Sequence, residues 1–487
     1  MGDFPVWIRA THWINVLFIG FLIRAGIQIL GAYPRLYLND NCTPGTEWVK
    51  FTRKKIPASG PWTALQQEED VPAWLGQPGG NNLGMGRHWH FFAAMFWIMN
   101  GLTYVALLFI SGEWDRLVPT TWSIFPQAWH TFVTYITLGK PPASAFHPFD
   151  PLQQLSYFAV IFILAPLLIV TAAAQSPAID GRFPWYPGIF GGRQRARSLH
   201  FLGLVAFVLF IIVHTFSVVY VHFRNNIGDI MLGQHTHDEA LAFVLAGIVI
   251  AAILAIYAAT SWYSRRYPRR VQRSLRHFVF PPMRSLSLAA RSQQNYGASD
   301  ISPYFIVNGD PPTTPEYEAL QAGGFNDWHI DVRGLVERPL TLSMSDLRAL
   351  PQEMQITKHH CIQGWTGVAS WTGVTLREVI ALCQPLQSAR YVVFSSYQLD
   401  LAGRPFYESI DIRVANHPQT LLAYEMNGSA LSVAHGAPLR LRVETELGFK
   451  MVKWLRTIEF VPDYRTRGDG QGGSREDNMF YEQSVGI

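Results

Sequence analysis

The chain has 487 residues, of which 49% are hydrophobic, 14% aromatic and 15% charged, with a formal net charge of +4. This length allows two or three domains. The small net charge, with no Lys/Arg run interleaved with aromatic residues, gives no sign of nucleic-acid binding. Three cysteines cannot supply the four thiolates of an iron–sulfur cluster and do not suggest a disulfide framework. They are Cys42, Cys361 and Cys383.

Five stretches are apolar and long enough to cross a bilayer, which requires about 20 helical residues. They lie at about 12–32, 88–111, 152–174, 197–223 and 240–262. Pro166 lies inside the third stretch and predicts a kink rather than a break. We find no twin-arginine motif and no cleavable signal at the start of the chain. The first hydrophobic segment is too long for the hydrophobic region of a signal peptide. We therefore predict an all-α, lipid-embedded bundle of five spans over residues 1–262 in a bacterial inner membrane.

Histidines within these stretches form a pattern suited to haem. An ionisable side chain is costly inside a membrane and usually has a function there. His200 and His214 are 14 residues apart, which puts them on one helix face and about 21 Å apart along the axis. His12 and His90 begin the first and second stretches, which enter from opposite sides. We therefore predict two haem-binding pairs, His12–His214 and His90–His200, with His88 as a competitor to His90.

A family resemblance supports this pattern. The segments VWIRATHWIN, GRHWHFFAAMFWIMNGLTYV and RSLHFLGLVAFVLFIIVHTFSVVY resemble the di-haem cytochrome b subunits of formate dehydrogenases, nickel–iron hydrogenases and thiosulfate reductases. The resemblance covers about residues 5–262 and implies two b haems on the four histidines and electron exchange with a membrane quinone. The 33–86 stretch is an insertion, and Arg24 could face a haem propionate or snorkel to the surface. Other histidines fall in loops or at interfaces and receive no metal: His130, His147, His222, His235, His237 and His277.

The composition and hydrophobic pattern of the sequence change after the fifth stretch. Residues 263–300 are rich first in arginine and then in serine and proline, as in a basic linker. Short β-like runs then alternate with turn signals, among them WHIDVRGLV, ARYVVFSSY, LRLRVETELG and TIEFV. We predict an α+β domain over residues 301–465, with a helix in TLREVIALC, followed by a polar tail over 466–487.

Cys361 lies in the segment KHHCIQGWTGVASWTGVTLREVI, which can form a tight loop followed by a helix from about Thr375. A thiolate is a soft metal ligand, although a single cysteine is more often a buried apolar residue. We assign that second role to Cys383 and regard Cys42, in a loop, as inert.

The second half has a resemblance of its own. WHIDVRGLVERPLTLSMSDLRALP, HHCIQGWTGVASWTGVTL and YEMNGSALSVAHGAPLRLRVETELGFKMVKWLRTIEF resemble the molybdopterin domain of sulfite-oxidase type, closest to the catalytic subunit of bacterial methionine-sulfoxide reductases. This resemblance implies that Cys361 donates its thiolate to molybdenum. It also implies contacts with the molybdopterin, whose phosphate needs backbone amides and a cation. The residues concerned are Asn308, Ser396, His435, Arg440, Met451, Val452 and Lys453.

Two departures limit this resemblance. Sulfite oxidases place arginines directly after the ligand cysteine, whereas residues 362–364 are Ile, Gln and Gly. The preceding Lys358, His359 and His360 could partly substitute for them. The dimerisation domain of animal and plant sulfite oxidases is missing, so homo-oligomerisation stays open.

The predicted function is a molybdenum oxidoreductase that transfers oxygen atoms and is coupled through two b haems to the quinone pool. Its substrate is a small oxo-acceptor or oxo-donor, with a sulfoxide or related S- or N-oxide as the leading choice. The alternatives are oxidation of sulfite or a similar sulfur compound, and a non-catalytic electron-transfer subunit of a larger complex. The direction of electron flow is not determined.

The distribution of basic residues predicts which side of the membrane the second half occupies. The loops on its side carry sixteen lysines and arginines, against four on the other side. Basic residues near span ends favour the cytoplasm. We therefore predict a cytoplasmic molybdenum domain, whereas the periplasmic location of the methionine-sulfoxide reductase relatives implies the alternative.

Overall fold

Five long helices form the transmembrane bundle that the sequence predicted. They are α1 (Val6–Ala32), α2 (Leu83–Ile110), a composite third span from Pro151 to Ala174, α8 (Arg193–Tyr220) and α10 (Glu239–Arg266). In this computed structural model the described residues are 4–57, 62–141, 149–221, 223–233, 238–287 and 296–483. Four histidines assigned to loops lie outside the described residues: His147, His222, His235 and His237.

The third span is continuous but changes helix type along its length. It consists of α4 (Pro151–Phe158), a π-helical segment (Ala159–Leu164) and α5 (Ala165–Ala174). Pro166 lies in the first turn of α5, where its missing N–H costs little because the wider π-turn precedes it. The span begins with a capping box, in which the Asp150 carboxylate accepts from the Gln153 backbone N–H.

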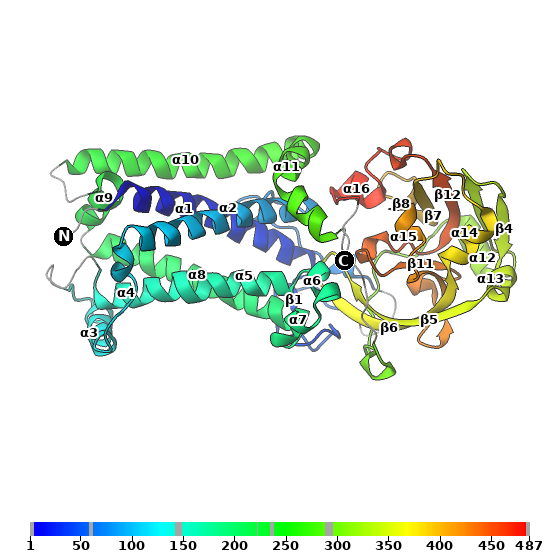
Figure 1. The fold of residues 1–487 in the computed structure, drawn as a ribbon, viewed down its shortest axis with the longest axis horizontal. Coiled ribbons are helices and arrows are strands. Elements are labelled where there is room, and N and C mark those ends of the chain that lie inside the picture. The colour runs from blue at the N-terminus through cyan, green and yellow to red at the C-terminus, as the bar shows by residue number, and fades with distance from the viewer. Residues whose placement is uncertain are drawn as a thin grey trace.

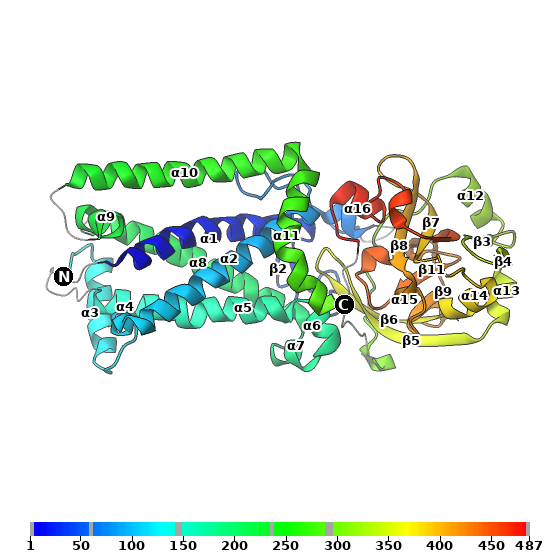
Figure 2. The same cartoon turned by 45° about the horizontal axis from the view of Figure 1, so that its top comes forward.

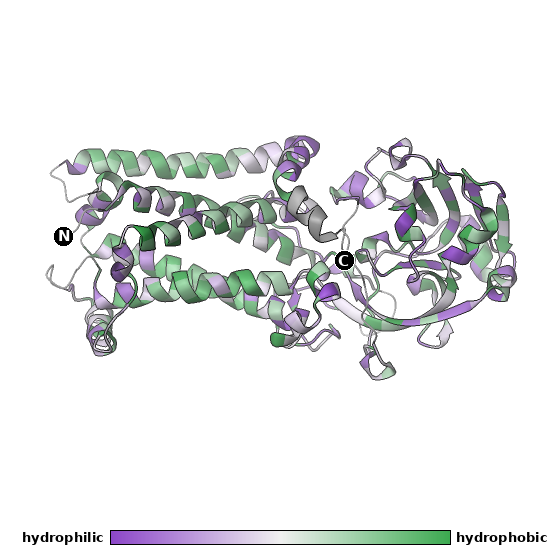
Figure 3. Cartoon of the chain, in the orientation of Figure 1, coloured by the Kyte–Doolittle hydropathy of each residue, from purple (hydrophilic) through white to green (hydrophobic). Residues whose placement is uncertain are grey.

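The bundle and the second domain are arranged end to end (Figure 1). The N-terminus lies at the end of the bundle remote from the second domain. Apolar residues run along the helices of the bundle, whereas polar and apolar residues alternate in the second domain (Figure 3). Short helices occupy the connections between spans: α3 (Ile124–Ile136), α6 (Pro177–Arg182), α7 (Trp185–Ile189) and α9 (Phe223–Leu232).

The segment predicted as a linker contains a further helix. α11 (Pro268–Ser287) follows α10 directly and crosses the end of the bundle (Figure 2). Its Val271 and Leu275 are buried in a cluster with Phe21 and Trp89 of α1 and α2. The segment between the two domains therefore contains an ordered helix, because every third or fourth residue of the arginine-rich run is apolar and packs against the bundle.

The second domain contains two five-stranded sheets and confirms the predicted α+β class. One sheet has the order β10–β9–β6–β5, with β11 pairing with β9, and the other has the order β4–β3–β12–β7–β8. The strands of the first are β5 (Gln352–His360), β6 (Thr366–Thr375), β9 (Thr420–Met426), β10 (Ser429–Ala430) and β11 (Arg440–Val443). Those of the second are β3 (His329–Gly334), β4 (Leu340–Ser343), β7 (Tyr391–Leu399), β8 (Pro405–Asp411) and β12 (Leu455–Val461).

Helices of this domain are short: α12 (Pro315–Ala322), α13 (Met344–Ala349), α14 (Leu376–Cys383), α15 (Ile412–Ala415) and α16 (Ser474–Met479). The predicted helix in TLREVIALC is α14, and Cys383 at its end is fully buried in the core, as expected. The polar tail contains α16 and packs against the rest of the chain. Lys450 is fully buried between Glu476 of this helix and Glu408 of β8.

The described residues of the connection between α1 and α2, 33–57 and 62–82, have little regular structure. They hold a two-stranded sheet, β1 (Arg35–Leu36) and β2 (Val49–Lys50), and one turn of 3-10 helix. This insertion lies at the end of the bundle that faces the second domain. Arg24 Nη2 of α1 donates to the carbonyls of Ala73 (2.7 Å) and Gly76 (2.9 Å) in the insertion, whereas its Nη1 is buried without a hydrogen-bond partner among the described residues.

Candidate functional site

Cys361 occupies the tight connection between strands β5 and β6. The two strands pair antiparallel as far as His360 and Thr366, which leaves residues 361–365 as the hairpin loop. The loop is closed by hydrogen bonds from Cys361 N to Trp365 O (3.1 Å) and from Gly364 N to Cys361 O (3.0 Å). Gly364 has a φ of +113°, a conformation that favours glycine. The tight loop predicted here is therefore present, although the Thr/Gly/Trp-rich stretch after it is strand β6.

The thiol of Cys361 is enclosed. The residue is 2% exposed, and burial raises the pKa of its thiol to about 12. Asn308 Nδ2 donates to its Sγ at 3.5 Å, and the thiol faces Gln363 Oε1 at 3.6 Å. A buried thiol with so high a pKa is unreactive on its own, whereas a bound cation stabilises the thiolate form.

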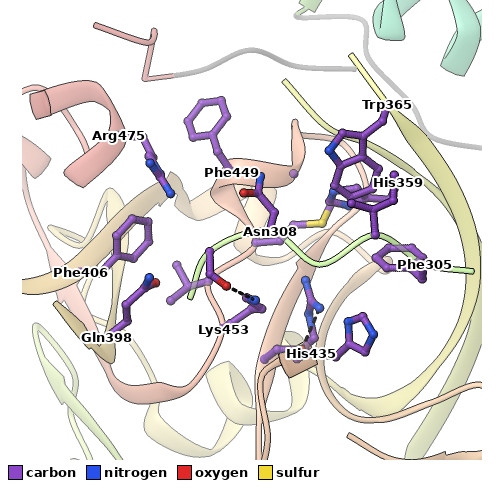
Figure 4. A pocket seen from close by; sticks show the side chains of 16 residues that line it. Phe305, Asn308, His359, Trp365, Gln398, Phe406, His435, Phe449, Lys453 and Arg475 are labelled. Atoms are coloured by element: carbon purple, nitrogen blue, oxygen red, sulfur yellow. Dashed lines mark hydrogen bonds between the residues drawn. The ribbon is translucent and has the colours of Figure 1, made fainter. Parts of the chain in front are cut away.

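A pocket lies beside the cysteine loop (Figure 4). Six of the seven residues expected to contact molybdopterin line it: Asn308, His435, Arg440, Met451, Val452 and Lys453. The seventh, Ser396, is buried outside this lining and has a supporting position. Its hydroxyl donates to the Lys453 carbonyl at 2.7 Å and accepts from Gln398 N at 3.0 Å.

The pocket is strongly basic and lacks compensating acids in its lining. Burial, with the neighbouring Arg440 and Lys453, lowers the pKa of His435 to about 3. Burial and Arg440 likewise lower the pKa of Lys453 well below its usual value. The Arg440 Nε and Asn308 Oδ1 atoms are buried without a hydrogen-bond partner among the described residues. An anionic group would accept from Arg440 Nε, and a group that also carries an N–H or O–H donor would satisfy Asn308 Oδ1, so the residues present fit a pterin with its phosphate.

Several further side chains of the lining were not predicted as cofactor contacts. Gln398, Phe406, Phe449 and Arg475 come from β7, β8, the loop before Met451 and α16. Arg475 lies in the segment predicted as a polar tail, and nothing in the sequence linked it to Cys361, more than a hundred residues earlier. The tail lies beyond the end of the family resemblance, so its sequence did not indicate that it folds back onto the pocket.

The side chains of the three residues before Cys361 point alternately to the two faces of strand β5. His359 points into the pocket, and its Nδ1 accepts from Arg442 at 3.1 Å. Lys358 and His360 point the other way, where Lys358 pairs with Asp40 and with Asp180 (2.9 Å), and His360 lies 3.4 Å from Asp180. Of the three residues expected to take the place of the missing arginines, His359 therefore lies at the pocket, whereas Lys358 and His360 do not.

The predicted haem-binding histidines face each other in two pairs. The ring centres of His12 and His214 are 6.4 Å apart, and those of His90 and His200 are also 6.4 Å apart. A histidine nitrogen binds a metal ion at about 2 Å and lies about 1 Å from its ring centre, so two imidazoles on one iron have ring centres about 6 Å apart. Both pairs fit one haem iron each.

Hydrogen bonds orient two of these rings. The Nδ1 atom of His214 lies 3.3 Å from the Tyr157 hydroxyl, and Nδ1 of His200 lies 3.1 Å from the Leu168 carbonyl. With Nδ1 occupied, Nε2 is left free to face a metal, as in many histidine-ligated sites.

His88 is engaged elsewhere. Its Nδ1 lies 2.7 Å from the Gly84 carbonyl, and its Nε2 lies 2.9 Å from the Glu482 carboxylate. The geometry therefore favours His90 over His88 as the partner of His200.

Two family models match the chain. Residues 3–234 match the model described as prokaryotic cytochrome b561, and residues 317–467 match the oxidoreductase molybdopterin binding domain. The chain joins a cytochrome b domain to a molybdopterin-binding oxidoreductase domain. Both resemblances inferred from the sequence are thereby confirmed.

Curated relatives match parts of the chain. A protein-methionine-sulfoxide reductase catalytic subunit of Campylobacter jejuni is 36% identical over 156 residues, which are 29% of this chain and 52% of the relative. A putative protein-methionine-sulfoxide reductase subunit of Azospira oryzae is 33% identical over 149 residues, 31% of this chain and 53% of the relative. The chain thus spans about half the length of these relatives. The crystal structure of a sulfane dehydrogenase from Paracoccus pantotrophus matches 30% of this chain and 42% of its own at 22% identity and a TM-score of 0.27.

Proposed function

We propose that the protein is a membrane-bound molybdenum oxidoreductase that reduces a sulfoxide or a related S- or N-oxide with electrons from a membrane quinol. A quinol releases two electrons and two protons to become a quinone. A sulfoxide takes up two electrons and two protons and yields a sulfide and water. The two half-reactions balance, and two haems that each carry one electron can connect them.

One observation carries this proposal: helix α8 presents both His200 and His214 and begins against the cysteine hairpin. Arg193 and Gln194, in its first turn, each donate to the Gly364 carbonyl at 2.8 Å. The His90–His200 pair is the nearer to the hairpin, since His200 lies seven residues, about 10 Å of helix, from Arg193. Along the bundle towards the second domain, the order is therefore the His12–His214 pair, then the His90–His200 pair, then Cys361.

Each group has a proposed role in this scheme. His12, His214, His90 and His200 hold two b haems, and Cys361 binds molybdenum, which supplies two-electron oxygen-atom-transfer chemistry when bound. The buried cations Arg440 and Lys453, with His435 and the adjacent backbone, hold the molybdopterin phosphate. Ser396 positions the Lys453 backbone for this contact.

The experiment follows the haem absorption while substrate is added. Purified protein in detergent is reduced anaerobically with a quinol and mixed with dimethyl sulfoxide or free methionine sulfoxide. We expect both haems to be reoxidised, two per sulfoxide consumed, in the wild type and not in Cys361→Ser. Haem reduction on adding sulfite to the oxidised protein, without any reoxidation by sulfoxides, would show that electrons flow in the opposite direction and overturn the proposal.

A further inference from the structure

The outer face of the cysteine hairpin is covered by other parts of the same chain. We call this cover the cap, defined as residues 33–57, 62–82 and 479–482. It consists of the insertion between α1 and α2 and of the last described residues of the tail. The cap joins the bundle at both ends of the insertion, through the ends of α1 and α2.

Apolar side chains of the cap pack directly around the site. Tyr33, Tyr37, Cys42, Trp62 and Ala64 of the insertion form one buried cluster that also contains Cys361 and Trp365. The five cap residues in it are at most 5% exposed. The Trp62 ring stacks on Tyr304, with ring centres 6.0 Å apart and planes 2° from parallel. Buried aromatic side chains of this kind contribute much of the stability of an interface.

Hydrogen bonds hold the cap on the loop itself. Gln363 Nε2, two residues after Cys361, donates to Glu68 Oε1 at 2.6 Å and to the Ala32 carbonyl at 3.2 Å. Thr366 Oγ1 donates to the Asp40 carbonyl at 2.7 Å. The two Gln363 bonds are buried and the Thr366 bond is partly buried, so opening the cap would leave several polar groups to be resolvated.

The tail closes the remaining side. Ile362 packs in a cluster with Tyr481 of the cap, Ala32, Leu83 and Phe449. The ring centres of Tyr481 and Phe449 are 5.1 Å apart. Gly84 lies so close to the tail that a Cβ there would be 2.1 Å from the Met479 carbonyl oxygen. The hairpin is therefore enclosed by the insertion on one side and by the tail on another.

A hollow in the cap has the size of a small-ligand pocket. Its volume is about 590 Å³, within the usual range for such pockets. Trp62 and Tyr304, which pack on the site, line it together with Lys50, Lys54 and Lys55. The hollow shares no lining residue with the pocket beside Cys361. A small molecule fits a space of its size, whereas a side chain attached to a folded protein brings a bulky backbone that the cap keeps away from the hairpin.

We propose that the cap restricts this enzyme to small-molecule S- or N-oxides and excludes methionine sulfoxide residues in folded proteins. This inference rests on the proposed reductase function and concerns its substrate class. It separates the chain from relatives that match part of it and whose names specify protein methionine sulfoxide.

The first experiment compares substrates. With reduced viologen as electron donor, wild-type protein is given dimethyl sulfoxide, free methionine sulfoxide, or calmodulin with oxidised methionines. We expect kcat/KM per sulfoxide group to be at least about a hundred-fold lower for oxidised calmodulin than for free methionine sulfoxide. Values within ten-fold of each other would overturn the proposal.

The second experiment locks the cap. Cys42 Sγ lies 3.7 Å from Thr366 Oγ1, so Thr366→Cys places a thiol where it can form a disulfide with the native Cys42. We expect this disulfide to form under mild oxidation and the locked protein to keep its turnover of free methionine sulfoxide to within two-fold. The matched control is Cys42→Ser combined with Thr366→Cys, which cannot cross-link.

These outcomes separate the two proposals. If no sulfoxide is reduced by the wild type, the proposed function fails, and the cross-link still reports whether the cap is seated. Failure of the cross-link to form, measured by free-thiol titration and peptide mass, would contradict the cap. Loss of turnover on locking, reversed by a reductant and absent from the control, would show that the cap opens in each cycle and overturn the inference.

Discussion

Gln194, six residues before His200 on α8, donates a hydrogen bond to the carbonyl of Gly364, three residues after Cys361. A second bond joins its Nε2 to Thr366 Oγ1 at 3.1 Å. Because α8 is continuous from this contact to His200, the position of the near histidine pair relative to the cysteine hairpin is set by one rigid element. The helix is thus both a structural support of the hairpin and a continuous link, completed by these hydrogen bonds, between the two proposed centres.

Removing this contact should slow electron transfer between the centres. Arg193→Ala combined with Gln194→Ala leaves the Gly364 carbonyl without either donor. We expect haem reoxidation by sulfoxide to slow about ten-fold, which corresponds to an increase of about 1.4 kcal/mol in its activation free energy, because the hairpin is held less firmly against α8. Viologen-driven turnover should stay near the wild-type value. Stopped-flow haem absorption measures the first and viologen oxidation the second. Arg195→Ala, on an exposed residue of the same turn, is the control and should change neither.

Haem content tests the histidine pairs. Pyridine haemochrome analysis should give two b haems per chain, falling to one in His214→Ala and to one in His90→Ala, because each variant loses one axial ligand. His88→Ala, two residues away, should retain two because His88 contacts Gly84 and Glu482 instead. One haem in the wild type, or loss of a haem in His88→Ala but not in His90→Ala, would contradict the pairing.

The role of Cys361 is tested separately from the haems. Cys361→Ser should abolish substrate turnover with either electron donor, because a serine hydroxyl is a harder ligand than a thiolate and is not ionised near neutral pH. Both haem spectra should be unchanged, since the cysteine lies outside the bundle. Cys383→Ala removes a buried thiol at the end of α14, remote from the pocket lining, and should retain turnover. Wild-type turnover in Cys361→Ser would refute molybdenum ligation by this residue.

Lys450 should be important for the stability of the second domain. Its Nζ pairs with Glu408 at 3.1 Å and with Glu476, and all three side chains are fully buried. Lys450→Ala leaves two buried carboxylates without a cation, which should cost about 3–5 kcal/mol. Thermal unfolding monitored by tryptophan fluorescence measures this loss. Lys50→Ala, on an exposed lysine, should change the free energy of unfolding by less than about 0.5 kcal/mol; equal effects would contradict the buried network.

The spans and the histidine pairs could be predicted because lipid imposes simple rules. A membrane helix must be apolar and long, so a histidine within it stands out, and helical periodicity then aligns His200 with His214. Strands β3, β7, β11 and β12 were predictable because each contains β-branched residues, joined in β7 and β12 by aromatic residues, and has turn signals at its ends.

The cap and the tail could not be predicted for the opposite reason. The insertion residues of the cap, 33–57 and 62–82, are held by single side-chain contacts such as that of Gln363 with Glu68, which leave no periodic trace in the sequence. Arg475 reaches the pocket because Glu476, the next residue, pairs with Lys450 in the core. Contacts between residues so distant along the chain depend on the complete fold, which local composition does not specify.

The orientation in the membrane is the last prediction. The second domain lies at the end of the bundle that carries the starts of α2 and α8 and the end of α10, and the N-terminus lies at the opposite end (Figure 1). Arg265, Arg266 and Arg270, near the end of α10, are exposed at this first end. Such residues favour the cytoplasmic side, so we propose that the molybdenum domain is cytoplasmic and that the His12–His214 pair is near the periplasmic face. Green fluorescent protein fused after residue 487 should fluoresce, and alkaline phosphatase at the same position should be inactive. The reverse result would place the domain in the periplasm.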